Sequence, residues 1–289
     1  MRSCGIIPRM LGVNQYGKAE THLVRVVRDR NVHELRDLLV SVALSGELDA
    51  VHLSGDNNAV LATDTQKNTV YAFAKEHGVG TPEQFALLLG RHFLGGAITR
   101  ARVQVVEVGW TRLADHAFVQ SAREQRVATV IVSAGGEWFV SGLSDLVVLK
   151  TTDSEFHGFP RDRYTTLVET NDRVLATAVS ARWRHDGSAS FDDARSALVD
   201  TFAAHHSLSL QQTLYAMGSA VLEACGAVSE VRLSMPNKHH FVVDLAPFGL
   251  SNDNEVFHAD DRPYGLIEGA VLRDDAPDPG PCWDPYPLI

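Results

Sequence analysis

The order of the predicted elements limits the fold of this chain more than any other feature. Strands are followed by two helices and then by strands, and this order occurs twice along the sequence. The first set has strands at 19–28 and 33–46, helices at 63–77 and from residue 81, and strands near 101–110, 126–134 and 137–141. The second set has strands near 145–151, 163–170 and 174–185, helices near 191–206 and 210–225, and strands near 229–235 and 238–245. This pattern predicts an α+β fold with helices on one face of an antiparallel sheet.

Local signals mark the ends of several of these elements. Thr63 and Gln66 have the capping-box spacing, in which two side chains bind the free N–H groups at a helix start. Thr81 followed by Pro82 is a second helix start, because proline fits the first helical position. The first two strands meet through Asp29-Arg30-Asn31, which predicts a long hairpin.

The length of 289 residues suggests about two domains. We expect an N-terminal tail at 1–13, domains at 14–143 and 144–273, and a proline-rich tail at 274–289. Five prolines in the eleven residues from Pro277 to Pro287 exclude a regular helix or central strand there. We interpret that stretch as disordered, with docking of Trp283 and Tyr286 on a neighbouring subunit left open.

The charge balance argues against a nucleic-acid partner. The formal net charge is -10, and no block of basic residues stands out. An acidic protein can still bind an anionic substrate through one well-placed arginine. No apolar run approaches the roughly 18 residues that a membrane helix needs.

Cysteine usage points to a reducing compartment. Cys4, Cys225 and Cys282 are odd in number, widely spaced and without CxxC pairing, which argues against a disulfide framework and a zinc site. The first nine residues are too short and interrupted for a signal peptide, and the chain does not end in an S-K-L-type peroxisomal address. We therefore expect a cytoplasmic protein of bacterial origin.

The stretch Ser234–Phe241 carries the clearest chemical signal. It reads as a strand entered through Pro236, so Asn237 and His239 share one face with Phe241. An amide and an imidazole on one face can hold a small polar molecule and transfer a proton to or from it.

Several sequence blocks resemble the urate oxidase (uricase) family, of a bacterial type. The Ser234–Phe241 stretch matches the family's S-x-P-N-K-H-x-F motif. Further similar blocks follow the family's order: Asn14–Glu20, Val60–Thr69, Ser154–Asp162, Tyr164–Leu167, Thr170–Arg173, Ser209–Tyr215, Asn254–Phe257 and Pro263–Ile267. Long blocks in one order are far more specific than a single motif.

This resemblance implies a fold, a reaction and an assembly. The fold would be two tandem tunnelling-fold domains, whose sheets close into a barrel around a tunnel when subunits assemble. The reaction would convert urate, O2 and water to 5-hydroxyisourate and hydrogen peroxide, without a metal or an organic cofactor. The assembly would be a homotetramer in which each active site draws residues from two subunits.

The resemblance also implies roles for individual residues. Phe156, Arg173 and Gln211 would clamp urate, together with backbone contacts at Leu210 and Asp64. Lys18 and Thr63 would remove a proton from urate, with His239 behind Lys18 as relay. Asn237 and Thr63 would hold O2 and then the attacking water.

These residue types suit a planar anion. A guanidinium is a flat two-donor fork, a primary amide both donates and accepts, and a phenyl ring offers a face for stacking. A threonine hydroxyl is a poor base unaided, so Lys18 would have to exchange its proton. A lysine does so near neutral pH only when burial lowers its pKa.

Simpler explanations exist for each residue alone. Arg173 could pair with Asp172 or Glu169, Gln211 could be a helix-cap neighbour, and Phe156 could belong to the core. The thirteen histidines permit a metal site, but adjacent histidines on a strand point to opposite faces and no H-E-x-x-H motif exists. We expect no functional metal.

Two other function classes stay open at this stage. One is a different tunnelling-fold enzyme acting on a pterin or purine, a group that generally uses zinc. The other is a non-catalytic protein that binds urate or another purine.

Overall fold

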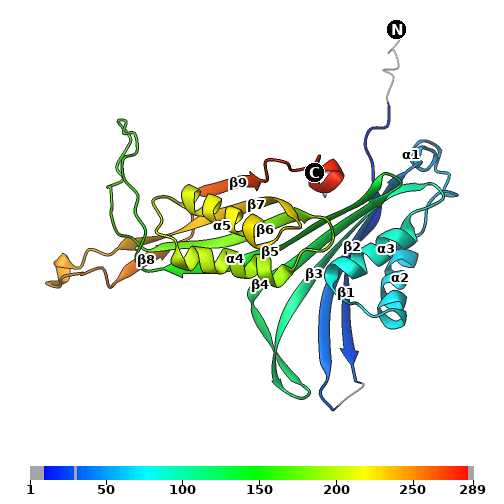
Figure 1. The fold of residues 1–289 in the computed structure, drawn as a ribbon, viewed down its shortest axis with the longest axis horizontal. Coiled ribbons are helices and arrows are strands. Elements are labelled where there is room, and N and C mark those ends of the chain that lie inside the picture. Colours follow the sequence, from blue (N-terminus) through cyan, green and yellow to red (C-terminus); the bar gives the residue numbers. More distant parts are fainter. Residues whose placement is uncertain (1–9, 29–30, 286–289) are drawn as a thin grey trace, which may run out of the picture. The chain divides into compact units, whose positions relative to one another are not determined.

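The computed structural model describes residues 10–28 and 31–285, and the chain divides into two compact units (Figure 1). Unit 1 comprises Met1–Glu107, Ala128–Trp138 and Gly280–Ile289, and unit 2 comprises Val108–Val127 and Phe139–Pro279. Three long strands begin in one unit and end in the other: β3 (Ile98–Ala114), β4 (Ala117–Ser133) and β5 (Gly136–Lys150). The domain limits expected from the sequence, 14–143 and 144–273, stay a prediction.

Unit 1 is built on an antiparallel sheet that starts with the predicted hairpin. Strand β1 (Tyr16–Val27) pairs with β2 (Glu34–Gly46), and β2 pairs in turn with the first half of β3. The hairpin is confirmed, although residues 29 and 30 of its connection lie outside the described chain. Nearly every residue in the middle of β2 is buried, on both faces of the strand, and its neighbours β1 and β3 flank both of its edges.

The helices of unit 1 are α1 (Asp49–Ser54), α2 (Thr63–Glu76) and α3 (Pro82–Phe93). The short α1 was not predicted. Helix α3 buries Phe85, Leu89 and Phe93 and comes so close to the sheet that a Cβ on Gly90 would meet Val132 at 2.8 Å. Only glycine permits that approach.

One of the two predicted helix caps is wrong. The N-cap of α2 is Ala62, and Thr63 is already the first helical residue, so its hydroxyl does not cap the helix. Gln66 instead donates from its side-chain amide to the carbonyl of Leu61. The cap of α3 is confirmed, because Thr81 and Gln84 form the reciprocal capping box.

Unit 2 is also built on an antiparallel sheet that helices cover on one face. Its strands include β5, β6 (Leu175–His185), β7 (Val228–Val242), β8 (Phe257–Asp260) and β9 (Leu266–Leu272). Strand β7 pairs with β6 along one edge and with β9 and then β8 along the other. Helices α4 (Phe191–Ala204) and α5 (Leu210–Ala224) lie over one face of this sheet (Figure 1). The core between the layers includes Trp183, Leu198, Met217, Val221 and Leu233, and the arrangement confirms the predicted α+β class.

Five predicted strands differ from the structure. The stretches 137–141 and 145–151 fall on the single strand β5, which ends at Lys150. The stretches 229–235 and 238–245 fall on the single strand β7, which ends at Val242. The segment 163–170 is irregular apart from a bridge at Thr170, and β8 and β9 were not predicted at all.

The interpretation of the proline-rich tail as disordered is also wrong for residues up to Pro285. A short 3-10 helix, η2 (Gly280–Trp283), packs against unit 1 and buries Cys282. Asp284 then accepts hydrogen bonds from Arg100 at its carboxylate (2.6 Å) and from Arg102 at its carbonyl (2.8 Å). Proline excludes regular structure here but not tight packing.

Candidate active site

Strand β7 changes its partner beside the residues that the sequence singled out. Pro236 pairs with Leu266 at the start of β9, whereas His239 pairs with Asp260 of β8. Between these points the backbone N–H of Asn237 donates to the carbonyl of Gly265 (2.8 Å). Pro236 has no N–H to donate, so it sits where the pairing of the strand is being exchanged. Asn237 and His239 therefore flank the point where β7 changes its partner.

The predicted sharing of one strand face is confirmed for His239 and Phe241. Their rings stack with centroids 5.5 Å apart and planes at 20°. Asn237 lies opposite Thr177 of β6, on the face whose earlier residues Leu233 and Met235 are buried in the core. The polar residues thus continue the core face beyond the reach of the helices.

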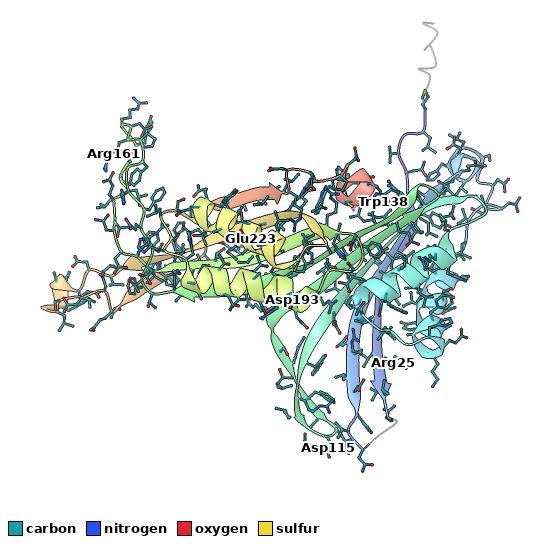
Figure 2. All side chains as sticks on the ribbon, in the orientation of Figure 1. Arg25, Asp115, Trp138, Arg161, Asp193 and Glu223 are labelled. Carbon is teal, nitrogen blue, oxygen red and sulfur yellow. The ribbon has the colours of Figure 1, made fainter. Side chains whose placement is uncertain are left out.

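The long segment between β5 and β6 carries Phe156 and Arg173, the predicted aromatic ring and cation of the site. Figure 2 labels Arg161 on the part of this segment that projects from the fold. Phe156 and Thr170 form an antiparallel bridge that folds the segment back on itself (2.8 and 3.1 Å). Arg173 then donates from its backbone to the carbonyl of Ser154 (2.9 Å) and from Nε to the hydroxyl of Ser154 (3.2 Å). These contacts bring Phe156 and Arg173 together.

The guanidinium of Arg173 is partly buried and lies over the ring of Phe156, 5.3 Å from its centroid. Burial lowers the pKa of Arg173 below its ordinary value. Within the described residues it forms no ion pair with a carboxylate: Asp172 accepts from Thr152, and Glu169 accepts from the N–H of Gly158. The alternative of a salt bridge to Asp172 or Glu169 is therefore wrong.

A cavity of about 600 Å³ brings four predicted site residues together. Phe156, Arg173, Asn237 and His239 all contribute to its wall. The wall also includes residues to which the sequence analysis gave no role: Thr170, His240, Phe241, Asn254 and Phe257. Strand alternation alone would have excluded His240. A partly buried cation, an amide, an imidazole and aromatic rings around one cavity are suited to a flat anion.

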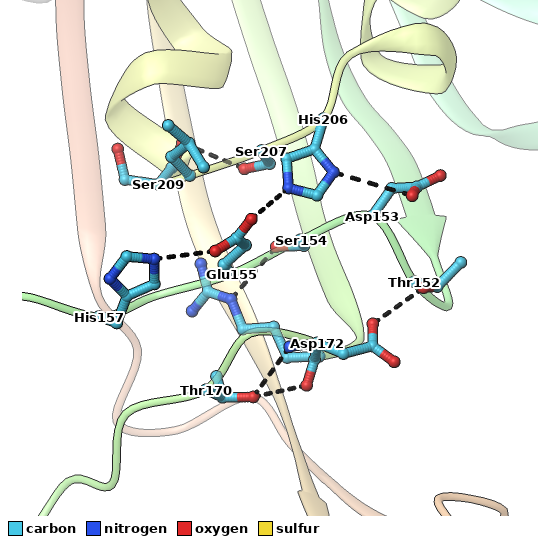
Figure 3. Close-up of polar contacts among 12 residues, drawn as sticks. Thr152, Asp153, Ser154, Glu155, His157, Thr170, Asp172, His206, Ser207 and Ser209 are labelled. Carbon is cyan, nitrogen blue, oxygen red and sulfur yellow. Dashed lines mark hydrogen bonds and ion pairs between the residues drawn. The ribbon is translucent and has the colours of Figure 1, made fainter.

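Leu210 and Gln211 lie at the start of α5 and do not line this cavity. Leu210 is buried and Gln211 is exposed, and Ser209 caps the helix by accepting from the N–H of Gln212 (3.2 Å). A parallel bridge between Ser154 and Ser207 links this helix start to the segment that carries Phe156 (Figure 3).

Lys18, Thr63 and Asp64 lie in unit 1. Lys18 is on β1 opposite Val42, and Thr63 and Asp64 open α2. Tyr16 of β1 binds the segment that precedes α2, because its hydroxyl accepts a hydrogen bond from the N–H of Leu61 (3.0 Å). Lys67 lowers the pKa of the exposed Asp64 carboxyl through a hydrogen bond and its charge, and Lys18 contributes last and least. The three residues thus gather where β1 meets the start of α2.

Fold and cavity together define the class: an α+β protein with a candidate site for a planar anion. Comparison with known proteins then identifies the family. The uricase family model matches residues 14–131 and 139–268. A uricase of Arthrobacter globiformis is 51% identical over 283 residues, covering 95% of this chain and 93% of that protein. A uricase of Dictyostelium discoideum is 38% identical over 276 residues, covering 90% of this chain and 96% of that protein. This chain belongs to the uricase family.

Solved structures agree with that assignment. The crystal structure of the Arthrobacter globiformis uricase matches with a TM-score of 0.92 and 50% identity, over 96% of this chain and 99% of the other. A uricase structure from Bacillus fastidious, at 23% identity, matches with a TM-score of 0.80 and supports the fold alone. The predicted tandem tunnelling fold is confirmed, and closure of the sheets into a barrel on assembly stays a prediction.

Two searches of the described residues complete the description of the site. No group of three or more histidine, cysteine, aspartate or glutamate side chains among them is arranged to hold a metal ion. None of their helices is long and apolar enough to cross a membrane.

Proposed function

We propose that this chain is a urate oxidase that converts urate, O2 and water to 5-hydroxyisourate and hydrogen peroxide. Two electrons pass from urate to O2, and water supplies the oxygen of the new hydroxyl group. Membership of the uricase family supports this activity, and the relatives at 51% and 38% identity are named uricases. The reaction would need neither a metal nor an organic cofactor, because the substrate itself supplies the electrons.

The observation that carries the proposal is the cation of Arg173 without a carboxylate partner among the described residues. A partly desolvated guanidinium held only by a neutral hydroxyl and a ring face retains its capacity for a bidentate anion. In the proposed complex the purine stacks on Phe156, and the guanidinium of Arg173 donates two hydrogen bonds to the purine edge that carries the negative charge. Gln211 and the backbone of Leu210 complete this clamp.

The chemistry requires removal of a proton from the bound urate anion. We assign this to Thr63 with Lys18, and the relay behind Lys18 to His239. Asn237 and Thr63 hold O2 beside the ring and afterwards the attacking water. The hydroxyl of Thr63 suits this role, because it does not cap α2.

The site is proposed to form between subunits. Lys18, Thr63 and Asp64 belong to unit 1, whereas Phe156, Arg173, Leu210, Gln211, Asn237 and His239 belong to unit 2. We propose a homotetramer in which unit 1 of one subunit faces unit 2 of another, with tandem domains at 14–143 and 144–273. A bacterial cytoplasmic location fits this proposal, because Cys225 is a buried free cysteine.

Oxygen consumption with urate, measured after exhaustive chelation, tests the proposed function. Stoichiometric uptake of O2 with release of peroxide is the expected result. Binding of urate without oxygen uptake would instead support a non-catalytic urate-binding protein. Activity that returns only on addition of zinc or another metal would support a different tunnelling-fold enzyme and would contradict the mechanism.

A further inference from the structure

A cluster of four ionisable side chains lies beside the clamp: Asp153, Glu155, His157 and His206 (Figure 3). Nε2 of His206 donates to one carboxylate oxygen of Glu155 at 2.5 Å, and Nε2 of His157 donates to the other at 2.8 Å. The Nδ1 atom of His206 also lies 3.8 Å from the carboxylate of Asp153. Glu155 is the centre of the cluster.

In the sequence, Glu155 lies between two residues that contact Arg173. It stands between Ser154, which accepts the hydrogen bond from Nε of Arg173, and Phe156, whose ring lies under that guanidinium. His206 stands on the other segment, four residues before Leu210 at the start of α5. The contact between Glu155 and His206 therefore joins the two segments that carry the clamp residues of unit 2.

The backbone makes the same connection. The N–H of Glu155 donates to the carbonyl of Ser207 (2.7 Å), and the N–H of Ser207 donates to the carbonyl of Asp153 (2.9 Å). The Glu155–His206 contact lies alongside this bridge, across 51 residues of sequence. His157, by contrast, is two residues from Glu155 on the same segment, so its contact cannot join the two segments.

The charge of Glu155 favours this contact between the two segments. The hydrogen bond from His206 lowers the pKa of the Glu155 carboxyl, and the contact with His157 lowers it further. The Glu155 side chain is 19% exposed and that of His206 is 51% exposed, so solvent screens the pair. Solvent-exposed ion pairs contribute little to global stability, so loss of this pair should affect local geometry more than folding.

We propose that the Glu155–His206 pair is a latch that sets the distance between the Phe156–Arg173 half of the clamp and the start of α5. Glu155 is then a positioning residue for the anionic substrate, and the identity of that substrate rests on the proposed function. The hydrogen bond from His206 also occupies a carboxylate oxygen of Glu155 and so reduces its repulsion of an anion bound at Arg173.

The test compares Glu155→Ala, His206→Ala and the double variant, with His157→Ala as the matched control. Oxygen uptake gives kcat and KM, and calorimetry under argon gives the affinity for urate without turnover. Each latch variant should raise KM about five- to tenfold while kcat changes less than about twofold, because ground-state positioning is lost. The double variant should be no worse than either single variant, since both remove the same contact. His157→Ala should behave like the wild type.

The outcomes separate the latch from the proposed function. A wild-type protein that consumes no oxygen with urate would refute the function itself. An active wild type whose KM is unchanged in both single variants would overturn the latch. Tighter urate binding in Glu155→Ala would mean that the carboxylate only repels the anion, and would also overturn it. If Glu155→Ala does not fold, His206→Ala tests the same contact by changing its more exposed partner. Glu155→Gln keeps a hydrogen-bond acceptor for His206 and should preserve most of the affinity for urate.

Discussion

The guanidinium carbon of Arg173 lies 5.3 Å from the centroid of the Phe156 ring, and Nε of Arg173 donates to the hydroxyl of Ser154. Ser154 is fully buried and is two residues from Phe156, so one short stretch of backbone fixes both the ring and the cation. A carboxylate in place of the Ser154 hydroxyl would neutralise Arg173. The neutral partner orients the cation and leaves its charge available to a ligand.

Arg173→Lys should mainly weaken substrate binding. The ammonium keeps the charge but loses the planar two-donor fork, so KM for urate should rise about 10- to 100-fold with a smaller change in kcat. Steady-state oxygen uptake measures both constants. Arg161→Lys is the control, because Arg161 also stacks on a ring, at 5.9 Å from the centroid of Phe159, but is exposed. A fall in kcat at unchanged KM in Arg173→Lys would mean that Arg173 takes part in the chemical step.

Thr63 and Thr81 should separate activity from stability. Thr63 is the first residue of α2 and Thr81 directly precedes α3, but only the side chain of Thr81 caps its helix. Thr81→Ala should lower the free energy of unfolding by about 1 kcal/mol and leave kcat unchanged. Thr63→Ala should change stability by less than about 0.5 kcal/mol yet remove most of the turnover. Thermal unfolding and oxygen uptake on the same preparations test the pair. Equal losses of stability in the two variants would contradict the cap assignment.

Gly218→Ala should test the packing of α5 on its sheet. A Cβ at this position would meet Cγ2 of Val271 at 2.6 Å and Cδ1 of Leu233 at 3.3 Å. Both neighbours are buried, so we expect an overpacking cost of about 1–3 kcal/mol, seen as a lower thermal midpoint. Gly226→Ala is the control, because nothing lies within 4 Å of its added Cβ. An unchanged midpoint for Gly218→Ala would mean that the helix can shift without cost.

The sequence predicted the four long helices and most strands because their signals are local. Strand β5 was predicted as two strands, 137–141 and 145–151, with a break that begins at Gly142. The structure explains the break: a Cβ on Gly142 would meet the carbonyl of Ala181 at 2.2 Å. A bulge follows, with Asp145 at a φ of 57°. Close approach of a neighbouring strand and a bulge both depend on partners distant in the sequence.

The segment 163–170 was predicted as a strand but is irregular apart from the bridge at Thr170. Its β-branched residues favour a strand, but Asp162 accepts hydrogen bonds from the N–H of Tyr164 and the hydroxyl of Thr165. Such local side-chain contacts compete with strand pairing. The side chains of Tyr164 and Val168 are 71% and 77% exposed, so burial does not favour a strand either.

The candidate site was predictable where short motifs carried it. Phe156, Arg173, Asn237 and His239 came from such blocks and line one cavity. The Glu155–His206 contact was not predictable, because its partners are 51 residues apart and meet only when the segments pair. The roles of Lys18, Thr63 and the other site residues stay predictions until kinetics test them.

Mixed oligomers of two inactive variants should recover activity if the site forms between subunits. Lys18→Met removes the proposed proton acceptor, and His239→Ala removes the relay behind it, so each variant alone should lose nearly all turnover. Lys18 belongs to unit 1 and His239 to unit 2. In a mixed tetramer, some sites would combine the intact Lys18 of one subunit with the intact His239 of another.

Co-expression of Lys18→Met and His239→Ala with different tags, followed by purification through both tags, isolates these mixed oligomers. Urate turnover in the dual-tagged sample should clearly exceed that of either variant purified alone. The matched control co-expresses Lys18→Met with Thr63→Ala. Both changes lie in unit 1, so every site of that mixture receives a defective unit 1 and should stay inactive. If the Lys18→Met and His239→Ala mixture is no more active than its components, each site is built within one chain, and the proposed assembly of the site is wrong.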